Sequence, residues 1–330
     1  MTDSFKAFRI DKDGDGVSGK FCDLKLDDLT EGDVVIRVSH STINYKDALA
    51  ATGRAPILRR YPLVGGIDLA GVVVASEDPE LDEGQPVLVN GAGMSEVRDG
   101  GYAGMARVPA EYVVPIPDGL DAHAAMQLGT AGFTAALAIH RMEQNGQRPE
   151  NGPIVITGAT GGVGSLAIDM AAGRGYEVTA VTGKAEGADY LREIGAREIL
   201  LRQDIDWGKR PLEKSIWAGA IDNIGGEALT WLTRTTAYAG NIASVGNAAD
   251  IELRSTVLPF ILRAVCLLGI SSVNTPRDLR LAVWRRIASD LRPNHLDRIS
   301  GNTIPFSALP DHFQDYIDGK VTGRTVVEIG

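Results

Sequence analysis

The chain has 330 residues, of which 44% are hydrophobic and 23% are charged, and it carries a net charge of −10. This composition argues against a disordered or fibrous chain, and the length allows two domains that each bury a core. The acidic balance argues against nucleic-acid binding, because phosphate contacts need a basic face.

The cysteine count and the apolar runs define the expected compartment. Two cysteines, Cys22 and Cys266, exclude a disulfide framework and a four-thiolate zinc lobe. The first residues have neither a basic segment nor an apolar one, and no run of about eighteen apolar residues follows. We therefore expect a reduced, cytoplasmic protein with no membrane partner.

Short strands dominate the chain up to about residue 120. Runs that are β-branched or alternate in polarity begin at Phe5, Val34, Ile67, Pro86 and Ala110. Clusters of Gly, Asp and Pro separate these runs, as turns do between strands. The series predicts a β-barrel-like domain.

One acidic segment in this region imitates a calcium site. The sequence from Asp11 to Gly16 resembles the opening of an EF-hand loop, but Cys22 stands where the twelfth ligand, a bidentate glutamate, belongs. The flanking residues do not have helical patterns. We predict a hairpin turn here.

From about Ala122 helices and strands alternate. Strands are predicted from Ile154 and Val178, each followed by a helix, and the later segments AGAIDNI, NIASVG and AVCLLGI supply further strands around the helix EALTWLTRTTA. This alternation implies a parallel sheet with right-handed crossovers. The tail from Phe306 predicts a helix and then a strand that returns to the first domain. We therefore predict an α/β chain with a barrel domain of residues 1–122 and 296–330 and a doubly wound domain of residues 123–295.

A glycine-rich turn from Thr157 to Gly164 joins a predicted strand to a predicted helix. Glycines in such a turn let the backbone approach a pyrophosphate, and the helix N-terminus offers N–H groups to the phosphates. Ala159 replaces the first glycine of the usual fingerprint, so a plain tight turn is the alternative. The predicted dinucleotide contacts are Thr160, Gly161, Gly162, Val163 and Gly164.

The choice of dinucleotide depends on the end of the next strand. An NAD site places an acid there, about 20 residues after the glycines. This chain has Thr182, Gly183 and Lys184 instead, and Arg202 follows the third strand. A hydroxyl, an N–H and two cations suit a 2′-phosphate, so we predict NADPH. The alternative is that Lys184 is a solvated surface lysine.

Further motifs point to a family. The chain resembles the zinc-free branch of the medium-chain dehydrogenase/reductase superfamily, and within it the acrylyl-CoA reductase family, whose members are also named quinone oxidoreductases. The resemblance covers essentially the whole chain and implies a GroES-like catalytic domain and a Rossmann nucleotide-binding domain. Besides the glycine turn it depends on Asn44-Tyr45-Lys46-Asp47, Gly66-Ile67-Asp68-Leu69-Ala70-Gly71, residues 129–135, residues 217–222, residues 259–263 and Gly323-Arg324.

The resemblance also bears on metal. Zinc-dependent relatives carry a cysteine where Asn44 stands and a Gly-His-Glu near Gly66-Ile67-Asp68. The five histidines of this chain show no ligand spacing. We therefore expect no metal ion and hydride transfer to a conjugated carbonyl.

Roles for single residues follow from the resemblance. Asn44 is expected near the nicotinamide ribose. Tyr45 is expected either to donate a proton or to line the pocket. Arg324 is expected either to orient the acyl carbonyl or a CoA phosphate, or to form a structural ion pair. Thr130, Gly246 and Ser271 are expected to approach the nicotinamide.

Three functions fit this sequence: an NADPH-dependent enoyl-thioester reductase acting on acrylyl-CoA, an NADPH-dependent quinone or general enone reductase, and a non-catalytic NADPH-binding protein. The basic segment with Arg54, Arg59 and Arg60 either meets the phosphates of CoA or is a solvated loop. The apolar stretch Ala264–Ile270 either forms the edge of a homodimer or is an internal strand; we expect the homodimer.

Overall fold

The structure is a computed structural model that describes residues 4–14 and 16–330. The chain folds into two compact units. Unit 1 runs to Thr130 and adds residues 273–282 and 300–330, and unit 2 holds residues 131–272 and 283–299. The domain boundaries expected from the sequence, at residues 122 and 296, stay a prediction. The compact units differ from the predicted domains in two places: the first segment of unit 1 ends just after Gly129, and residues 273–282 belong to unit 1 and not to the Rossmann domain. None of the described helices is long and apolar enough to cross a membrane.

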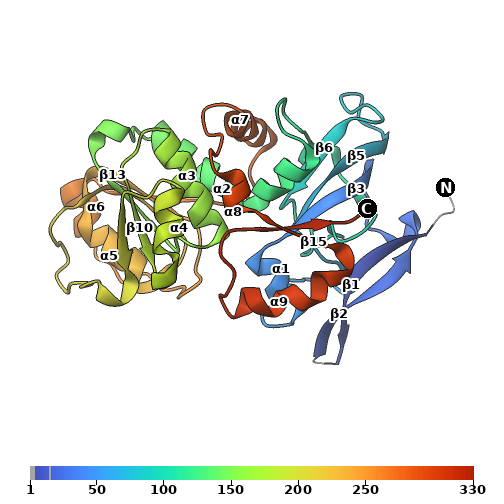
Figure 1. Cartoon of the computed structure of the whole chain (residues 1–330), viewed down its shortest axis with the longest axis horizontal. Helices are drawn as coiled ribbons and strands as arrows, with labels where there is room; N and C mark the ends of the chain where they lie inside the picture. The colour runs from blue at the N-terminus through green and yellow to red at the C-terminus, as the bar shows by residue number, and fades with distance from the viewer. Residues whose placement is uncertain (1–3, 15) are drawn as a thin grey trace. The chain divides into compact units, whose positions relative to one another are not determined.

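Unit 1 is built on a seven-stranded sheet that confirms the predicted β-domain (Figure 1). Its strand order is β15-β16-β3-β5-β6-β8, and β7 pairs with β3. The final strand pairs antiparallel with β3, Thr325 opposite Ile43, so the tail returns to the first domain as expected. The strands are β3 (Val34–Ile43), β5 (Asp68–Ser76), β6 (Pro86–Asn90), β7 (Met105–Val108), β8 (Val114–Pro115), β15 (Asn302–Pro305) and β16 (Thr325–Glu328).

A second, three-stranded sheet in unit 1 has the order β2-β1-β4. Strands β1 (Phe5–Asp13) and β2 (Gly16–Leu24) form an antiparallel hairpin, and β4 is Leu63–Val64. The predicted hairpin is therefore confirmed, and Asp15 of the segment Asp11–Gly16 lies outside the described residues.

One predicted strand in unit 1 is wrong in part. The run from Ala110 begins with a 3₁₀ turn, Ala110–Tyr112, before the two-residue strand β8. The N–H of Ala110 donates to the Asp33 carboxylate at 2.7 Å, so it is not available to a strand ladder.

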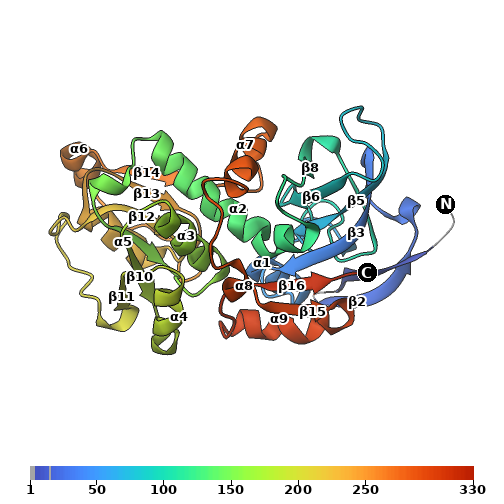
Figure 2. The same ribbon diagram turned by 45° about the horizontal axis from the view of Figure 1, so that its top comes forward.

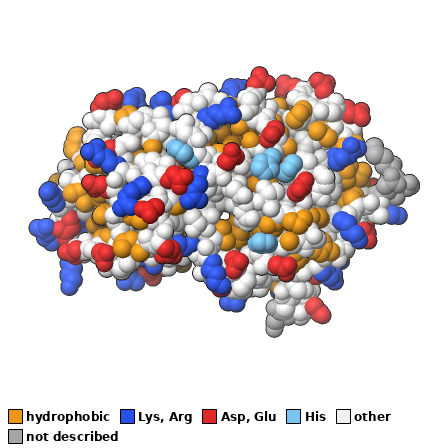
Figure 3. All heavy atoms as spheres, in the orientation of Figure 1, with side chains coloured by type: hydrophobic (Ala, Val, Ile, Leu, Met, Phe, Trp, Pro, Cys, Tyr) orange, Lys and Arg blue, Asp and Glu red, His pale blue; other side chains and the backbone are white. Residues whose placement is uncertain are grey.

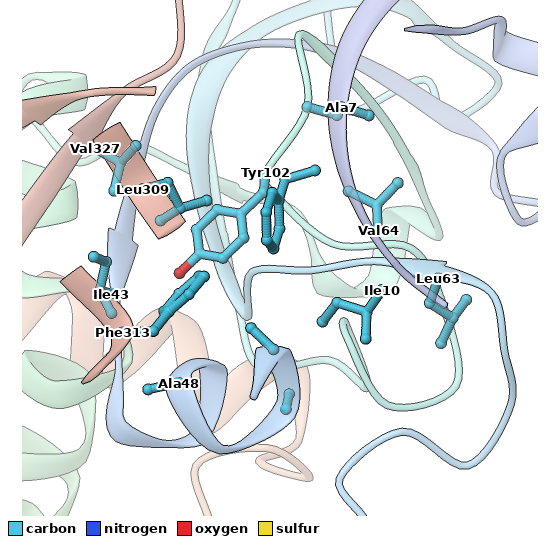
Figure 4. Packing of buried hydrophobic residues seen from close by; sticks show 14 of the residues in the cluster. Ala7, Ile10, Ile43, Ala48, Leu63, Val64, Tyr102, Leu309, Phe313 and Val327 are labelled. Carbon is cyan, nitrogen blue, oxygen red and sulfur yellow. The ribbon is translucent and has the colours of Figure 1, made fainter. Parts of the chain in front are cut away.

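A buried cluster of apolar residues supports helix α1 (Tyr45–Ala51), which follows β3 directly. Tyr102 packs close to Phe313 of helix α9 (Leu309–Ile317), and its hydroxyl donates to the carbonyl of Thr42 at 3.1 Å (Figure 4). Ala48 of α1 lies in the same cluster. This packing fixes the first turn of α1.

Unit 2 contains a parallel six-stranded sheet with the order β11-β10-β9-β12-β13-β14, which is the doubly wound dinucleotide-binding order. Helices cover both of its faces (Figures 1 and 2), so the predicted Rossmann architecture is confirmed. The strands are β9 (Ile154–Thr157), β10 (Val178–Thr182), β11 (Glu198–Leu201), β12 (Trp217–Asp222), β13 (Thr236–Ser244) and β14 (Cys266–Gly269). The helices are α3 (Gly162–Gly173), α4 (Ala188–Glu193), α5 (Gly226–Thr235), α6 (Leu258–Arg263) and α8 (Leu296–Ile299).

Two helices contribute residues to both units. Helix α2 (Ala122–Gln144) is interrupted at Gly129, whose φ of 49° and ψ of −153° are not helical, and helix α7 is Arg277–Ile287. Acidic and basic side chains are mixed over the visible face of each unit, with no large basic area on that face (Figure 3).

Candidate active site and cofactor site

A buried carboxylate organises the candidate site in unit 1. Asp68, the first residue of β5, is 0% exposed and accepts hydrogen bonds from Asn44 Nδ2 at 2.8 Å and from the Thr130 hydroxyl at 2.6 Å. A guanidinium nitrogen of Arg324 lies 3.9 Å from it. Burial raises the pKa of Asp68, and the charge of Arg324 and these hydrogen bonds oppose that shift. The carboxylate therefore ties together three residues that are far apart in the sequence.

The interruption of α2 at Gly129 belongs to this arrangement. A Cβ atom at Gly129 would lie 2.7 Å from the Asp68 carboxylate and 2.7 Å from the Arg324 guanidinium. The positive φ also favours glycine. Gly129 thus lets the chain pass over the ion pair, and it directs the N–H of Thr130 to Asp68 at 2.9 Å.

Both the nitrogen and the oxygen of the Asn44 side-chain amide form hydrogen bonds. It is the N-cap of α1, and Asp47 accepts the Asn44 backbone N–H at 2.9 Å, as in a capping box. Its Nδ2 donates to Asp68 and, at 3.2 Å, to Asp47, while its Oδ1 accepts from Arg324 at 2.9 Å. The orientation of Asn44 is therefore fixed.

Asp47 is a second buried acid of this cluster and is 1% exposed. Burial, with a contribution from the negative charge of Asp68, raises the pKa of Asp47 to about 7, although hydrogen bonds from Asn44 and Ile67 lower it. The Asn44 amide, which donates to both carboxylates, joins Asp47 to Asp68.

Arg324 is 3% exposed and donates four hydrogen bonds to protein groups. Its partners are the carbonyl of Gln127 at 3.3 Å, the hydroxyl of Thr42 at 2.7 Å, the carbonyl of Ile43 at 3.4 Å and the Asn44 oxygen. Of the two roles expected for it, this geometry fits the structural ion pair, because its donors already face protein acceptors. Arg324 thus acts on the site through Asn44 and Asp68.

Tyr45, by contrast, is accessible. It is the first residue of α1, directly after Asn44, and is 47% exposed. Within the described residues its hydroxyl makes no hydrogen bond. The next residue, Lys46, pairs with Glu96. At the start of α1, the oriented amide of Asn44 is therefore followed directly by the phenol of Tyr45, which is accessible to a ligand.

The glycine turn in unit 2 has the conformation expected of a phosphate-binding turn. Gly161 is the N-cap of α3, so Gly162, Val163 and Gly164 form the first helical turn, whose N–H groups have no intrahelical acceptor. A Cβ at Gly164 would clash with the carbonyl oxygen of Gly158. The helix N-terminus is therefore open to an anion, and the close approach requires glycine.

Two polar side chains that are not among the predicted cofactor contacts fix this turn. The hydroxyl of Thr157, at the end of β9, donates to Asp222 at 2.6 Å, and the amide of Asn223 donates to the carbonyl of Thr157 at 2.7 Å. Both partners lie at or just after the end of β12. These bonds join the carboxyl ends of the two central strands, where parallel α/β sheets bind ligands.

The predicted determinants of cofactor choice lie at the same end of the sheet. The hydroxyl of Thr182 accepts the N–H of Lys184 at 3.0 Å, and burial lowers the pKa of Lys184. The Arg202 guanidinium lies about 3.6 Å from where a Cβ at Gly183 would be. A cavity of about 320 Å³ is lined by Gly183, Arg202, Gln203, Trp207, Ile224 and Gly225, among others. Its size and position suit an adenosine moiety, with Arg202 at its wall.

The remaining predicted contacts follow the strand ends. Gly246 lies just after β13, where a Cβ would clash with the carbonyl oxygen of Asn223, and Ser271 lies just after β14. Both therefore lie at the carboxyl edge of the sheet in unit 2. Thr130 and Asn44 belong to unit 1.

Comparisons with known proteins show which family the chain resembles. Residues 30–118 match the family described as alcohol dehydrogenase GroES-like domain, and residues 162–289 match that described as zinc-binding dehydrogenase. The chain is 44% identical over 330 residues to the "Acrylyl-CoA reductase AcuI" of Ruegeria pomeroyi, with 98% of this chain and 99% of the relative covered. It is also 44% identical to the "Putative quinone oxidoreductase YhfP" of Bacillus subtilis, with both chains covered completely.

The chain belongs to the zinc-free quinone oxidoreductase and acrylyl-CoA reductase family of medium-chain dehydrogenases/reductases. Solved structures extend this likeness. Salmonella enterica yhdH in complex with NADP is 41% identical with a TM-score of 0.95, covering 98% of this chain and all of that one. Bacillus subtilis yhfP with NAD bound is 44% identical with a TM-score of 0.96, covering 99% and 100%.

Membership of this family makes the donor set around Asn44 informative. Cysteine, histidine and carboxylate groups bind zinc, whereas here a neutral amide is hydrogen-bonded to two carboxylates and a guanidinium. Among residues 4–14 and 16–330, no group of three or more His, Cys, Asp or Glu side chains is placed to hold a metal ion.

Proposed function

We propose that this protein is an NADPH-dependent reductase that transfers hydride to the β-carbon of an α,β-unsaturated thioester such as acrylyl-CoA. The whole-length likeness to a relative named acrylyl-CoA reductase supports this substrate class. The observation that carries the proposal is at the start of α1, where the buried polar groups of Asn44, Asp68 and Arg324 bind one another and the phenol of Tyr45 is accessible.

The residues of unit 2 fit the cofactor. The open N-terminus of α3 suits a pyrophosphate, and the cavity beside Gly183 suits the adenosine, whose 2′-phosphate Arg202 and Lys184 would hold. No acid stands at the end of β10 to select a free 2′-hydroxyl. The relatives of known structure bind NADP in one case and NAD in another, so the preference is itself testable.

Reduction of an α,β-unsaturated thioester requires two contributions from the residues of this chain, stabilisation of the enolate and its protonation. The reduced nicotinamide supplies the hydride, and the enolate that forms on the substrate then needs stabilisation and a proton at the α-carbon. We assign the hydrogen bond to the thioester oxygen, or the proton, to the Tyr45 hydroxyl. Asn44 and Thr130, oriented by Asp68, would position the nicotinamide ribose and ring, and Arg324 would hold Asn44 in place.

A second candidate is reduction of a quinone by the same hydride step, which the name of the Bacillus subtilis relative favours. Reduction of a quinone needs the same nicotinamide, but a quinone has no CoA. The two candidates therefore differ in whether the protein must also bind the CoA part of the substrate. An accessible tyrosine beside the reacting centre can hydrogen-bond either acceptor.

The deciding experiment follows NADPH consumption by the purified protein with acrylyl-CoA and, in parallel, with a small quinone, and identifies propionyl-CoA by mass spectrometry. Turnover of acrylyl-CoA to propionyl-CoA is the expected result. Turnover of the quinone alone would overturn the thioester proposal in favour of the second candidate. Turnover of neither, with NADPH bound, would favour a non-catalytic NADPH-binding protein.

We also propose that the protein forms a homodimer through the edge of the unit 2 sheet. Among the described strands, β13 is the only neighbour of β14 in that sheet. Large apolar side chains of β13, α6 and β14 are exposed, and an open edge beside apolar surface favours association. They are Tyr238, Ile261, Leu262 and Leu267.

A further inference from the structure

Unit 1 contains a second cavity that the proposed hydride chemistry does not use. It has a volume of about 590 Å³, within the range of small-molecule sites. The loop before β3, the segment after α1, the loop before Asp99 and strand β7 all contribute to its wall. The lining residues that matter here are Asp27, Glu31, Arg60, Val97, Arg98 and Arg107.

Three arginines line this cavity, and none forms an ion pair with another described residue. The Arg98 guanidinium stacks over the ring of Tyr112 with 5.2 Å between them, and its Nε is buried without a hydrogen-bond partner. Arg107 donates through Nε to the carbonyl of Gly32 at 3.0 Å, which fixes that side chain and leaves its terminal nitrogens to other acceptors. Arg60 is exposed. Guanidinium groups that are held in place but not neutralised, as those of Arg98 and Arg107 are, are typical of phosphate sites.

Two acids, Asp27 and Glu31, also line the cavity, and both are exposed. Three guanidinium groups against two carboxylates leave one net positive charge. The carboxylates would repel a phosphate at close range, but exposed charges are screened by salt. Carboxylates also accept hydrogen bonds from ribose hydroxyls, as in dinucleotide sites. The lining therefore fits a phosphorylated nucleoside better than a free phosphate.

A chain of contacts links the cavity to the first turn of α1. Lys46, which follows Tyr45, pairs with Glu96, and the carbonyl of Glu96 accepts the N–H of Arg59 at 2.8 Å. Val97 and Arg60, the next residues of those two segments, line the cavity. A long, flexible ligand lying along this segment would place one end at Tyr45 and the other among the arginines. A CoA thioester has this form, with a reactive acyl group and a phosphorylated nucleotide at opposite ends.

We propose that the cavity lined by Arg60, Arg98 and Arg107 binds the phosphorylated adenosine end of the CoA thioester. This inference depends on the proposed function. It also refines the expectation that the basic segment with Arg54, Arg59 and Arg60 meets the phosphates of CoA. Arg60 lines the cavity, whereas Arg54 interacts electrostatically with Asp318 beyond α9. Arg98 and Arg107 lie far from that loop in the sequence, so no local pattern joins them to it.

The test uses the purified full chain and two substrates, acrylyl-CoA and acrylyl-pantetheine, which lacks the phosphorylated nucleotide. The variants are Arg60→Gln and Arg98→Gln, with Arg54→Gln as the matched control. Loss of one charge-assisted hydrogen bond should raise the KM for acrylyl-CoA about tenfold and leave kcat unchanged. The KM for acrylyl-pantetheine should not change in any variant, and Arg54→Gln should match the wild type. Arg60 is exposed, so Arg60→Gln keeps the test valid if Arg98→Gln fails to fold.

The outcomes separate this inference from the proposed function. If Arg60→Gln and Arg98→Gln leave the KM for acrylyl-CoA unchanged, or raise both KM values equally, the inference is overturned while the reductase activity stands. If the wild type reduces neither thioester, the proposed function fails, and calorimetric titration with adenosine 3′,5′-bisphosphate still tests the cavity. Weaker binding to Arg60→Gln than to Arg54→Gln would support the site, and equal binding would overturn it.

Discussion

The carboxylate of Asp68 accepts both the backbone N–H and the hydroxyl of Thr130, at 2.9 and 2.6 Å. The same carboxylate accepts the amide of Asn44 at 2.8 Å. Two residues expected to approach the cofactor, one at the start of α1 and one after the break in α2, are therefore oriented by one buried acid. Arg324 supplies the nearby positive charge.

Asp68→Asn should be strongly destabilising. The substitution removes the negative charge beside Arg324, which is buried and then lacks a counter-ion. Breaking a buried pair on one side costs about 3–5 kcal/mol of unfolding free energy. Urea denaturation of the wild type and the variant at one pH measures the difference.

Asp23→Asn is the matched control. Asp23 pairs with Lys6 on the surface, with a side chain that is 56% exposed, so its loss should cost about 0–1 kcal/mol. Equal losses for the two variants would show that the Asp68 cluster is no more important than a surface ion pair.

Asp47→Asn should change how stability depends on pH. The pKa of Asp47 is raised to about 7 in the folded protein, whereas an unfolded aspartate titrates near pH 3.9. Between these values the folded state binds more protons than the unfolded state, so this group makes the protein less stable as the pH rises. The free-energy advantage of wild type over Asp47→Asn should therefore fall from pH 5 to pH 7, by at most about 1.4 kcal/mol per pH unit.

Denaturation of both proteins at several pH values between 5 and 8 measures this difference. The slope should flatten above pH 7, because both states are then deprotonated. A difference between wild type and Asp47→Asn that stays constant over the whole range would mean that Asp47 is ionised throughout.

Tyr45→Phe removes one hydroxyl and little else. Tyr45 is half exposed, and its hydroxyl has no hydrogen bond within the described part of the chain, so stability should not change. If the phenol assists proton transfer, kcat with acrylyl-CoA should fall about 10²–10⁴-fold. Steady-state kinetics with the KM for NADPH as internal control measures this. Unchanged kcat would leave Tyr45 as a pocket-lining residue only.

The fold was largely predictable because its signals are local. The strand–turn–helix from Ile154 and the alternating segments after it lead directly to the parallel sheet. The run from Ala110 was the exception, because the N–H of Ala110 is bound by Asp33, about eighty residues earlier in the chain, and no local pattern reveals such a partner.

The site was predictable in its residue types but not in their relations. Asn44, Thr130 and Arg324 were found by resemblance, but that Asp68 joins them is a consequence of four separate segments meeting in one core. The surroundings of Arg324 could not be read from its position near the end of the chain, because its burial and its four hydrogen bonds to protein groups involve segments far apart in the sequence. Asp222 and Asn223 were not predicted as site residues because each acts through a hydrogen bond to Thr157, which lies on another strand.

Arg202→Gln should weaken binding of NADPH but not of NADH. The Arg202 guanidinium lies against Gly183 at the cavity proposed for adenosine, where only the phosphorylated cofactor offers it an anion. Loss of that contact should raise the KM for NADPH about tenfold. The control is Arg197→Gln. Arg197 is exposed, pairs with Glu177 and precedes β11, the strand that Arg202 follows, and this variant should behave as wild type. Parallel changes for NADPH and NADH would contradict a 2′-phosphate contact.

Ile261→Glu tests the homodimer. Ile261 is 68% exposed on α6, in the apolar surface beside the open edge of β14. If a second copy covers this surface, a buried and unpaired carboxylate there should dissociate the pair, because its desolvation has no compensating partner. Light scattering should give twice the 35.1 kDa chain mass for the wild type and the single mass for the variant. Val97→Glu, at an exposed valine of unit 1, should remain dimeric, and a monomeric wild type would contradict the proposed assembly.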